Sequence, residues 1–262
     1  PPVDTASPQS VRDAIRKGFW SGPTSGVCPG YLQANMVILH KDLAPDFEKF
    51  CNSNPQPCPL LAVLPAGCKE AASLAKNSDI TTDLPKYRIY RQGRLTEEVT
   101  DIKDVWTDEM VVFLIGCSFS FEGHLINAGV PVRNIQQRRN VSMYTTSIQC
   151  NPVGFFDCPL VVSYRPVPEH LVDTAKLVTQ KYGAAHGPPV HIGDPAEIGI
   201  SDIAKPDYGE SVVAQEGDVP MFWACGVTST LAAISHPKAD IVITHAPGHM
   251  FISDRKEFAD TQ

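Results

Sequence analysis

Residues 111–122 read Val-Val-Phe-Leu-Ile-Gly-Cys-Ser-Phe-Ser-Phe-Glu, an apolar run that ends at Gly116 and is followed by polar side chains. The run is too short to cross a membrane and is typical of a buried strand that delivers polar groups to its own end. Ligands of open α/β sheets usually bind at the carboxyl ends of strands, so this end is a candidate site. Its candidate residues are Cys117, Ser118, Ser120 and Glu122. The alternative is a structural turn with a buried thiol, since free cysteines are common in protein cores.

Two later stretches end in the same way. Residues 220–225 form an apolar run that ends in Cys225, and residues 241–244 form another that is followed by His245. If these strands lie beside the first one in a single sheet, Cys117, Cys225 and His245 converge on one cleft. Strand and helix patterns alternate along the chain, which favours an α/β fold with a mixed, largely parallel sheet covered by helices on both faces.

The segment 66–106 departs from this alternation. Residues 87–91 and 95–99 flank a turn at Gln92 and Gly93, which is a hairpin signal and indicates an antiparallel excursion. We therefore assign residues 1–65 and 107–262 to a main α/β domain, and residues 66–106 to part of a smaller antiparallel α+β lobe.

Other polar side chains could bind a small carboxylate. The glycine- and proline-rich residues 22–30 let backbone amides approach an anion, or else form a plain connecting loop. Gln33 and Asn35 fall in phase on one face of the strand expected next, where they could hydrogen-bond a carboxylate. Arg165 directly follows another expected strand, where a sheet presents functional groups, and could bind a substrate carboxylate.

A second polar concentration spans residues 186–195 and contains His191 and Asp194. His191 is a candidate acid or base, although histidines in loops more often make ordinary hydrogen bonds. Asp194 precedes Pro195 in a helix-capping arrangement, which gives it a structural role besides its candidate role in substrate binding. The histidines of this segment are not at a metal-ligand spacing, so a metal site is possible only through residues distant in sequence, and we expect none.

Composition limits the classes of function. The 262 residues carry a net charge of -7, which argues against a nucleic-acid partner, because such proteins gather lysine and arginine. No apolar stretch approaches the roughly 18 residues of a membrane span, and nothing at the amino end resembles a signal peptide, so we expect a soluble protein with no membrane partner. The eight cysteines form no C-x-x-C pair and are expected to be reduced thiols. We expect a cytoplasmic location, or the mitochondrial matrix if the source is eukaryotic; a homo-oligomer stays open.

Several long motifs, spread over nearly the whole chain, carry a family resemblance. They are Gly22-Pro-Thr24, Pro29-Gly-Tyr-Leu-Gln-Ala-Asn35, Leu114-Ile-Gly-Cys-Ser-Phe-Ser-Phe-Glu122, His186-Gly187, Val190-His-Ile-Gly-Asp-Pro195, Phe222-Trp-Ala-Cys-Gly-Val-Thr228 and Thr244-His-Ala-Pro-Gly248. With them the chain resembles a bacterial hydro-lyase family that is related to the amino-terminal region of mitochondrial D-glutamate cyclase. The resemblance implies a three-layer α/β domain with a smaller α+β domain, and a hydro-lyase that acts on a small amino or hydroxy acid. We expect a small carboxylate as the substrate and no cofactor. The most concrete activity it implies is dehydration of D-glutamate to 5-oxo-D-proline.

That cyclisation needs a base for the ammonium group, a cradle for the tetrahedral oxyanion and an acid for the departing oxygen. Our hypothesis assigns acid and base work to Glu122, His191 or His245. Oxyanion stabilisation falls to the amides and hydroxyls near Ser118 and Ser120. The candidates for binding the substrate are Gln33, Asn35, Ser118, Ser120, Arg165, Asp194 and Cys225.

Two other hypotheses stay open. In the first, Cys117 is the nucleophile of an amide or lactam hydrolase and a histidine is its base. In the second, the protein binds small acidic metabolites without catalysis and regulates or accompanies a partner enzyme.

Overall fold

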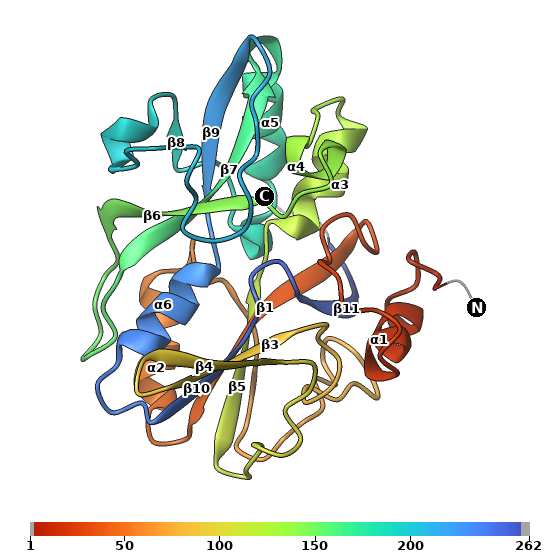
Figure 1. The fold of residues 1–262 in the computed structure, drawn as a ribbon, viewed down its shortest axis with the longest axis vertical. Coiled ribbons are helices and arrows are strands. Elements are labelled where there is room, and N and C mark those ends of the chain that lie inside the picture. Colours follow the sequence, from red (N-terminus) through yellow and green to blue (C-terminus); the bar gives the residue numbers. More distant parts are fainter. Residues whose placement is uncertain (1–2, 258–262) are drawn as a thin grey trace.

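The computed structural model describes residues 3–257, which form two β-sheets with helices between and around them (Figure 1). The larger sheet has seven strands in the order β2-β5-β1-β10-β3-β4, with β11 also paired to β1. Its strands are β1 (Tyr31–His40), β2 (Leu60–Leu64), β3 (Tyr87–Arg91), β4 (Arg94–Val99), β5 (Met110–Gly116), β10 (Ile241–His245) and β11 (Phe251–Lys256).

The smaller sheet lies in the upper half of Figure 1 and has the order β6-β7-β9-β8. Its strands are β6 (Ser142–Gln149), β7 (Pro159–Pro168), β8 (His191–Ile192) and β9 (Asp218–Ala224). The α-helices are α1 (Pro8–Arg16), α2 (Ala44–Ser53), α3 (Phe119–Asn127), α4 (Arg133–Gln136), α5 (Val172–Thr179) and α6 (Val227–Ser235). Three short 3-10 helices are η1 (Glu169–Leu171), η2 (Gly183–Ala185) and η3 (Pro195–Ile198).

Neighbouring strands run antiparallel in both sheets. A mixed α/β fold is therefore confirmed, but the prediction of a largely parallel sheet is wrong. The apolar runs of β1 and β5 report burial on both faces, which is usual for parallel strands but does not depend on strand direction.

The two faces of β5 pack into different hydrophobic cores. Val112 and Leu114 lie in a core that includes side chains of the coil segments before β3 and after β4. Phe113 and Ile115 lie in a second core with the aromatic rings of α2 and with residues of the smaller sheet. The Phe113 and Phe47 ring centroids are 4.8 Å apart in an edge-on arrangement. Coil therefore covers one face of the larger sheet, where a parallel α/β fold would place helices.

Helices α3 and α6 connect the two sheets. The helix after β5, α3, contacts β1 and also α5, which packs on β7 of the smaller sheet. The helix after β9, α6, contacts β1, β10 and β7. Because β9 belongs to the smaller sheet, the strands before Cys117, Cys225 and His245 do not share one sheet, and that premise of the convergent cleft is wrong.

Gly116, the last residue of β5, is required by a close approach of backbone. A Cβ atom there would lie 1.7 Å from the carbonyl oxygen of Ala184, which no side chain tolerates. On the same strand end, the Gly116 N–H donates to the carbonyl of Pro59 at 2.9 Å. The glycine therefore allows η2 to lie directly against the end of β5.

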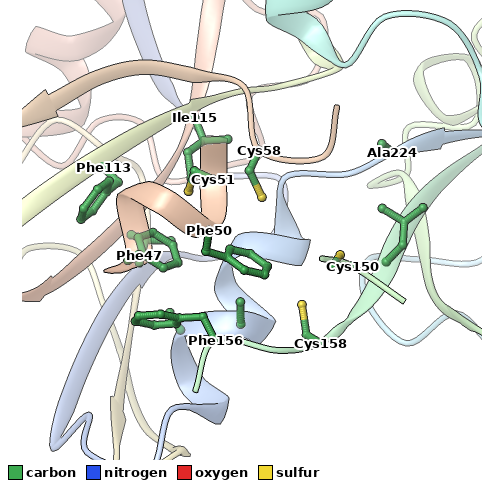
Figure 2. Close-up of a cluster of buried hydrophobic side chains, with 14 of the residues drawn as sticks. Phe47, Phe50, Cys51, Cys58, Phe113, Ile115, Cys150, Phe156, Cys158 and Ala224 are labelled. Carbon is green, nitrogen blue, oxygen red and sulfur yellow. The ribbon is translucent and has the colours of Figure 1, made fainter. Parts of the chain in front are cut away.

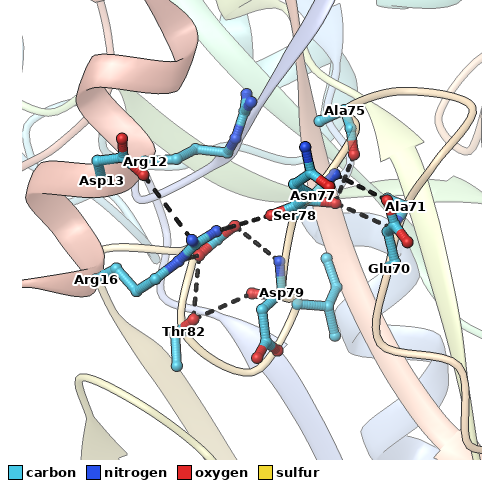
Figure 3. A network of polar contacts seen from close by, with 12 residues as sticks. Arg12, Asp13, Arg16, Glu70, Ala71, Ala75, Asn77, Ser78, Asp79 and Thr82 are labelled. Atoms are coloured by element: carbon cyan, nitrogen blue, oxygen red, sulfur yellow. Dashed lines mark hydrogen bonds and ion pairs between the residues drawn. The ribbon is translucent and has the colours of Figure 1, made fainter.

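Residues 66–106 contribute the expected hairpin, β3 and β4, to the larger sheet through the pairing of β3 with β10. Their assignment to a smaller lobe stays a prediction. Figure 3 shows how the coil of this segment is tied to α1. Arg16 donates from Nε and Nη2 to the two carboxylate oxygens of buried Asp83, both at 2.7 Å. Asp83 also accepts from the Asp79 N–H at 2.8 Å and the Thr82 hydroxyl at 3.0 Å, so one carboxylate organises the coil that covers the sheet.

Glu257, directly after β11, gives the stability a dependence on pH. Its side chain is 1% exposed, and neither carboxylate oxygen has a hydrogen-bond partner within residues 3–257. Burial raises the pKa of Glu257 to about 8, and burial also lowers the pKa of His124, whose Nε2 lies 3.4 Å from the Glu257 Oε2, so burial opposes an ion pair between them.

The folded protein thus holds a proton that the unfolded chain releases near pH 4.5, so the contribution of Glu257 to the stability should fall as the pH rises from about 5 to 8. Buried histidines with lowered pKa values, such as His245, act in the opposite direction below about pH 6.5. We expect Glu257→Gln to lack the contribution of Glu257, so its free energy of unfolding should rise relative to that of the wild type between pH 5 and 8. At pH 8 the variant should be the more stable protein. Urea unfolding at several pH values measures both effects. The exposed Glu48→Gln serves as the matched control, and an unchanged slope in Glu257→Gln would contradict the assignment.

Candidate functional site

A cavity of about 550 Å³ lies where segments far apart in the sequence meet. Residues 21–23 form one wall, β3 and β4 a second, and the turns at residues 207–210 and 246–249 the others, with Asn140 between them. Cavities of this size accept small molecules.

Asn140 holds the two turns of the cavity together. Its backbone N–H donates to Glu210 at 2.8 Å, and its side-chain amide donates to the carbonyl of Pro247 at 2.9 Å. Gly248 has a φ of +82°, and a Cβ there would lie 2.3 Å from the Asn140 Oδ1. That Oδ1 is buried and accepts no hydrogen bond within the described residues, which leaves an acceptor at the wall.

The cavity carries both signs of charge. The carboxylate of Glu98 lies between two cations, 3.3 Å from the Lys86 Nζ and 3.0 Å from the Arg88 Nε. On another wall, Asp207 accepts from the Thr145 N–H at 2.7 Å, and Glu210 is fixed by Asn140. The cavity can therefore hold a ligand that carries both a carboxylate and an ammonium group.

His249 and Tyr208 add groups that can move or hold a proton. The Nδ1 of His249 lies 3.0 Å from the carbonyl of Pro247, and because a carbonyl only accepts, Nδ1 carries the proton and Nε2 is the basic nitrogen. Burial lowers the pKa of His249, with Lys86 and Arg88 adding to the effect, so the ring is neutral at pH 7. Burial raises the pKa of Tyr208, so its hydroxyl keeps its proton.

Arg165 and Glu122, two of the residues that the sequence singled out, form an ion pair inside the protein and do not line this cavity. Each side chain is 1% exposed, and the Arg165 Nη2 lies 2.8 Å from the Glu122 Oε1. Arg165 also donates to the hydroxyls of Ser118 at 3.0 Å and Ser163 at 2.9 Å.

The guanidinium of Arg165 packs against the neighbouring rings of Phe121 and Trp223, 5.3 and 5.7 Å from their centroids. The other oxygen of Glu122 accepts from the hydroxyl of Ser25 at 2.7 Å. Ser25 follows the cavity wall at residues 21–23, so the buried pair anchors the loop that forms this wall.

Hydrogen bonds to the backbone occupy the side chains of Gln33, Asn35 and Ser120. Ser120 accepts from the Gln33 N–H at 2.9 Å, and the Gln33 amide donates to the carbonyls of Thr24 and Val27 at 2.9 and 3.0 Å. The Asn35 amide donates to the carbonyl of Gly116 at 2.8 Å. These contacts fix the loop at residues 22–30 and the end of β5.

Cys117 and Cys225 come together in one buried cluster with Val227 and Met250. Burial raises the pKa of Cys117 well above its usual range and that of Cys225 to about 11. Both thiols are therefore protonated at neutral pH, which is the state of packing residues rather than of activated nucleophiles.

The remaining candidates lie apart. His245 is buried in the larger sheet, where its Nδ1 accepts from the Met36 N–H at 3.1 Å, and burial lowers its pKa to about 4. His191 belongs to β8 of the smaller sheet, where its Nε2 donates to the carbonyl of Asp194 at 2.8 Å. Asp194 caps η3 by accepting from the Ala196 N–H at 2.9 Å.

The sequence reasoning missed the polar residues of the cavity. Lys86, Arg88, Asn140, Tyr208, Glu210 and His249 lie in a hairpin and in irregular segments without a periodic pattern. A signal was present in two of the family motifs, Gly22-Pro-Thr24 and Thr244-His-Ala-Pro-Gly248, because both contribute to the wall.

Within residues 3–257, no three or more His, Cys, Asp or Glu side chains are grouped to hold a metal ion. The same range contains no helix that is long and apolar enough to span a membrane. A cytoplasmic location and a homo-oligomer stay predictions.

The family profile and the relatives of this chain agree with one another. A family profile described as D-glutamate cyclase matches residues 111–254. A protein of Bacillus velezensis, provisionally named a hydro-lyase, is 56% identical over 248 residues, covering 95% of this chain and 94% of that protein. YcsI of Bacillus subtilis, with the same provisional name, is 54% identical over 251 residues, covering 96% and 97%. A nitrogen repressor-like protein from Methanococcus jannaschii aligns with 92% of each chain at 9% identity and a TM-score of 0.40, too low to support an argument.

Proposed function

Because the chain belongs to the D-glutamate cyclase family and is a relative of bacterial proteins named as hydro-lyases, we propose that it converts D-glutamate to 5-oxo-D-proline with loss of water. The observation that carries the proposal is the cavity at residues 21–23, 207–210 and 246–249. It presents cations, carboxylates and a neutral imidazole to one space. The cations can bind the two carboxylates of D-glutamate, and the carboxylates can bind its ammonium group. The neutral imidazole can accept a proton from that ammonium group.

Binding uses the opposite charges of the walls. Lys86 and Arg88 bind the carboxylates of the substrate, and Asp207 and Glu210 bind its ammonium group. Glu98 holds the two cations and neutralises one of them, so one positive charge remains at this wall, while Asp207 and Glu210 make another wall negative. A guanidinium also stabilises the oxyanion that forms when the amine attacks the side-chain carboxyl.

His249 transfers protons from the ammonium group of the substrate to the leaving oxygen. Its Nε2 accepts a proton from the ammonium group, and the freed amine forms the C–N bond to the side-chain carboxyl carbon. The imidazolium, acidic because the pKa of His249 is lowered, protonates one oxygen of the tetrahedral intermediate, and Nε2 then carries the second proton of the attacking nitrogen to the same oxygen, so that the C–O bond breaks and water departs. The Tyr208 hydroxyl donates a hydrogen bond to the reacting carboxyl.

Of the two alternative functions, the cysteine-dependent hydrolase is weaker on physical grounds. A Cys117 nucleophile would need a thiolate, whereas burial raises the pKa of this thiol. A non-catalytic binder of small acids would use the same cavity, and only a turnover measurement separates it from the cyclase.

The experiment incubates purified protein with D-glutamate and with L-glutamate and follows 5-oxoproline by mass spectrometry. The proposal requires 5-oxo-D-proline to form in proportion to enzyme and time. Saturable binding of D-glutamate without product would support the binder, and the absence of both binding and product would remove the substrate assignment.

Arg88→Met is expected to raise the KM for D-glutamate about 10-fold or more, because a charge-assisted hydrogen bond to the substrate carboxylate is lost. Arg91→Met is the matched control. Arg91 lies on the same strand, is exposed, and pairs only loosely with Glu97 at 3.9 Å. Steady-state kinetics should show an unchanged KM for the control. Equal KM values for both variants would place the substrate carboxylate elsewhere.

A further inference from the structure

Four buried thiols gather between the two sheets, at a distance from the cavity described above. Cys51 lies on α2 and Cys58 in the coil after it, while Cys150 and Cys158 flank the loop Asn151–Asp157 that joins β6 to β7 (Figure 2). All four are free cysteines. The proposed reaction uses none of them.

Cys150 and Cys158 stand opposite each other on antiparallel chain segments. Gln149 pairs with Pro159 in the register of β6 and β7, and continuing this register by one residue sets Cys150 opposite Cys158. The Cys150 N–H donates to the Cys158 carbonyl at 3.1 Å, which continues the ladder. Residues directly opposite in such a ladder have Cα atoms about 4.5–5.5 Å apart. A disulfide requires roughly 4.4–6.8 Å, so the backbone already satisfies it.

The two thiols also interact directly. Cys150 has its pKa lowered through a hydrogen bond with the Cys158 thiol, whereas the same contact, with burial, raises the pKa of Cys158. Ionisation of one thiol of the pair is thus favoured by the proton that the other keeps, and Cys150, which is 7% exposed against 4% for Cys158, is the thiol that a reagent reaches first.

Exposure distinguishes this pair from the second one. Cys150 is 7% exposed, whereas Cys51 is 0% and Cys58 is 1% exposed. The interaction of Cys58 with Cys51 raises the pKa of Cys58, which disfavours its thiolate. A small oxidant therefore meets Cys150 before it meets the inner pair.

We propose that Cys150 and Cys158 form an intramolecular disulfide when the protein meets hydrogen peroxide. The Cys150 thiolate attacks one peroxide oxygen, the O–O bond breaks, and the released hydroxide takes a proton to become water. The sulfur of Cys158 then displaces the hydroxyl from the sulfenic acid on Cys150, and the thiol proton leaves with it as a second water. The two thiols lose two electrons, and one peroxide is reduced to two waters.

The disulfide would close the β6-β7 loop, which already packs against α2. Asn54 and Asn151 exchange two hydrogen bonds at 2.9 and 2.8 Å, and the ring of Phe156 lies 5.1 Å from that of Phe47 on α2. These contacts attach the β6-β7 loop to the helix beneath it. Closing the short loop with a disulfide restricts the unfolded chain, which should lower the unfolding equilibrium constant by about 10- to 100-fold.

The test exposes the reduced full chain to hydrogen peroxide, blocks the remaining thiols with an alkylating reagent and maps the peptides by mass spectrometry. The expected result is one linkage, Cys150 to Cys158, that dithiothreitol reverses. Urea unfolding of the oxidised protein should show the 10- to 100-fold decrease. In Cys150→Ser neither change should occur, and Cys68→Ser, which removes a more exposed thiol, should behave as the wild type.

The mapping uses the wild-type chain, so the result does not depend on whether a variant folds. A linkage of Cys51 to Cys58 alone would overturn the proposal. So would oxidation of Cys68 while Cys150 and Cys158 stay fully alkylated.

Discussion

His249→Asn is expected to lower kcat for D-glutamate cyclisation by about 100-fold or more, the usual contribution of a general acid-base group. An asparagine amide can still donate to the Pro247 carbonyl, as the His249 Nδ1 does, so the turn is expected to keep its shape. It has no basic nitrogen, and the ammonium group of the substrate therefore keeps its proton. Initial rates of 5-oxoproline formation at several substrate concentrations separate kcat from KM, and KM should change little.

Two controls accompany this variant. His170→Asn changes an exposed histidine of η1 and should leave kcat unaltered. Because burial lowers the pKa of His249 below 6.5, wild-type activity should decline only in more acidic solution, as the imidazole becomes protonated. This decline should be absent from His249→Asn. A kcat within a factor of two of the wild type would contradict the role given to His249.

Arg165→Met is expected to destabilise the fold by about 3–5 kcal/mol, because it leaves the Glu122 carboxylate buried without its cation. Burial already raises the pKa of Glu122, and Arg165 is the main group that opposes this effect. The double variant Arg165→Met/Glu122→Leu should recover part of the loss, with a coupling energy of about 2 kcal/mol or more. Urea unfolding followed by tryptophan fluorescence suits this site, since Trp223 lies against the guanidinium.

The matched control for this pair lies on the surface. Lys49 and Asp46 of α2 are 3.4 Å apart, with side chains 69% and 59% exposed. Lys49→Met should therefore cost less than about 0.5 kcal/mol. A comparably small cost for Arg165→Met would show that the buried pair is not what joins β7 to α3.

Local elements were predictable because their signals are local. The turn at Gln92-Gly93 predicted the β3-β4 hairpin, and the apolar run before Gly116 predicted β5. Strand direction was not predictable in the same way, since burial of both faces of β5 produces the same apolar run whether its neighbours are parallel or antiparallel.

The candidate site shows the same limit at the level of side chains. Ser118, Glu122 and Arg165 were singled out for their place after strands, and they do meet, but through hydrogen bonds that occupy them inside the protein. Their exposure depends on β7 and α3 being packed together, which no local pattern reports. Tyr208 and His249 reach the cavity from turns, where position in the sequence carries little information about direction.

The pairing of β1 has a consequence for biosynthesis. One edge of β1 pairs with β5, and the other is shared between β10 and β11, which end at Lys256. At about 5–20 residues per second, ribosomes need on the order of 10–45 s after making β1 before these last strands exist. During that time the nascent chain presents an apolar strand with one open edge, a template for aggregation. We therefore expect the yield of native protein in cells to depend on chaperones that bind nascent chains, and on the translation speed of the codons for residues 241–256.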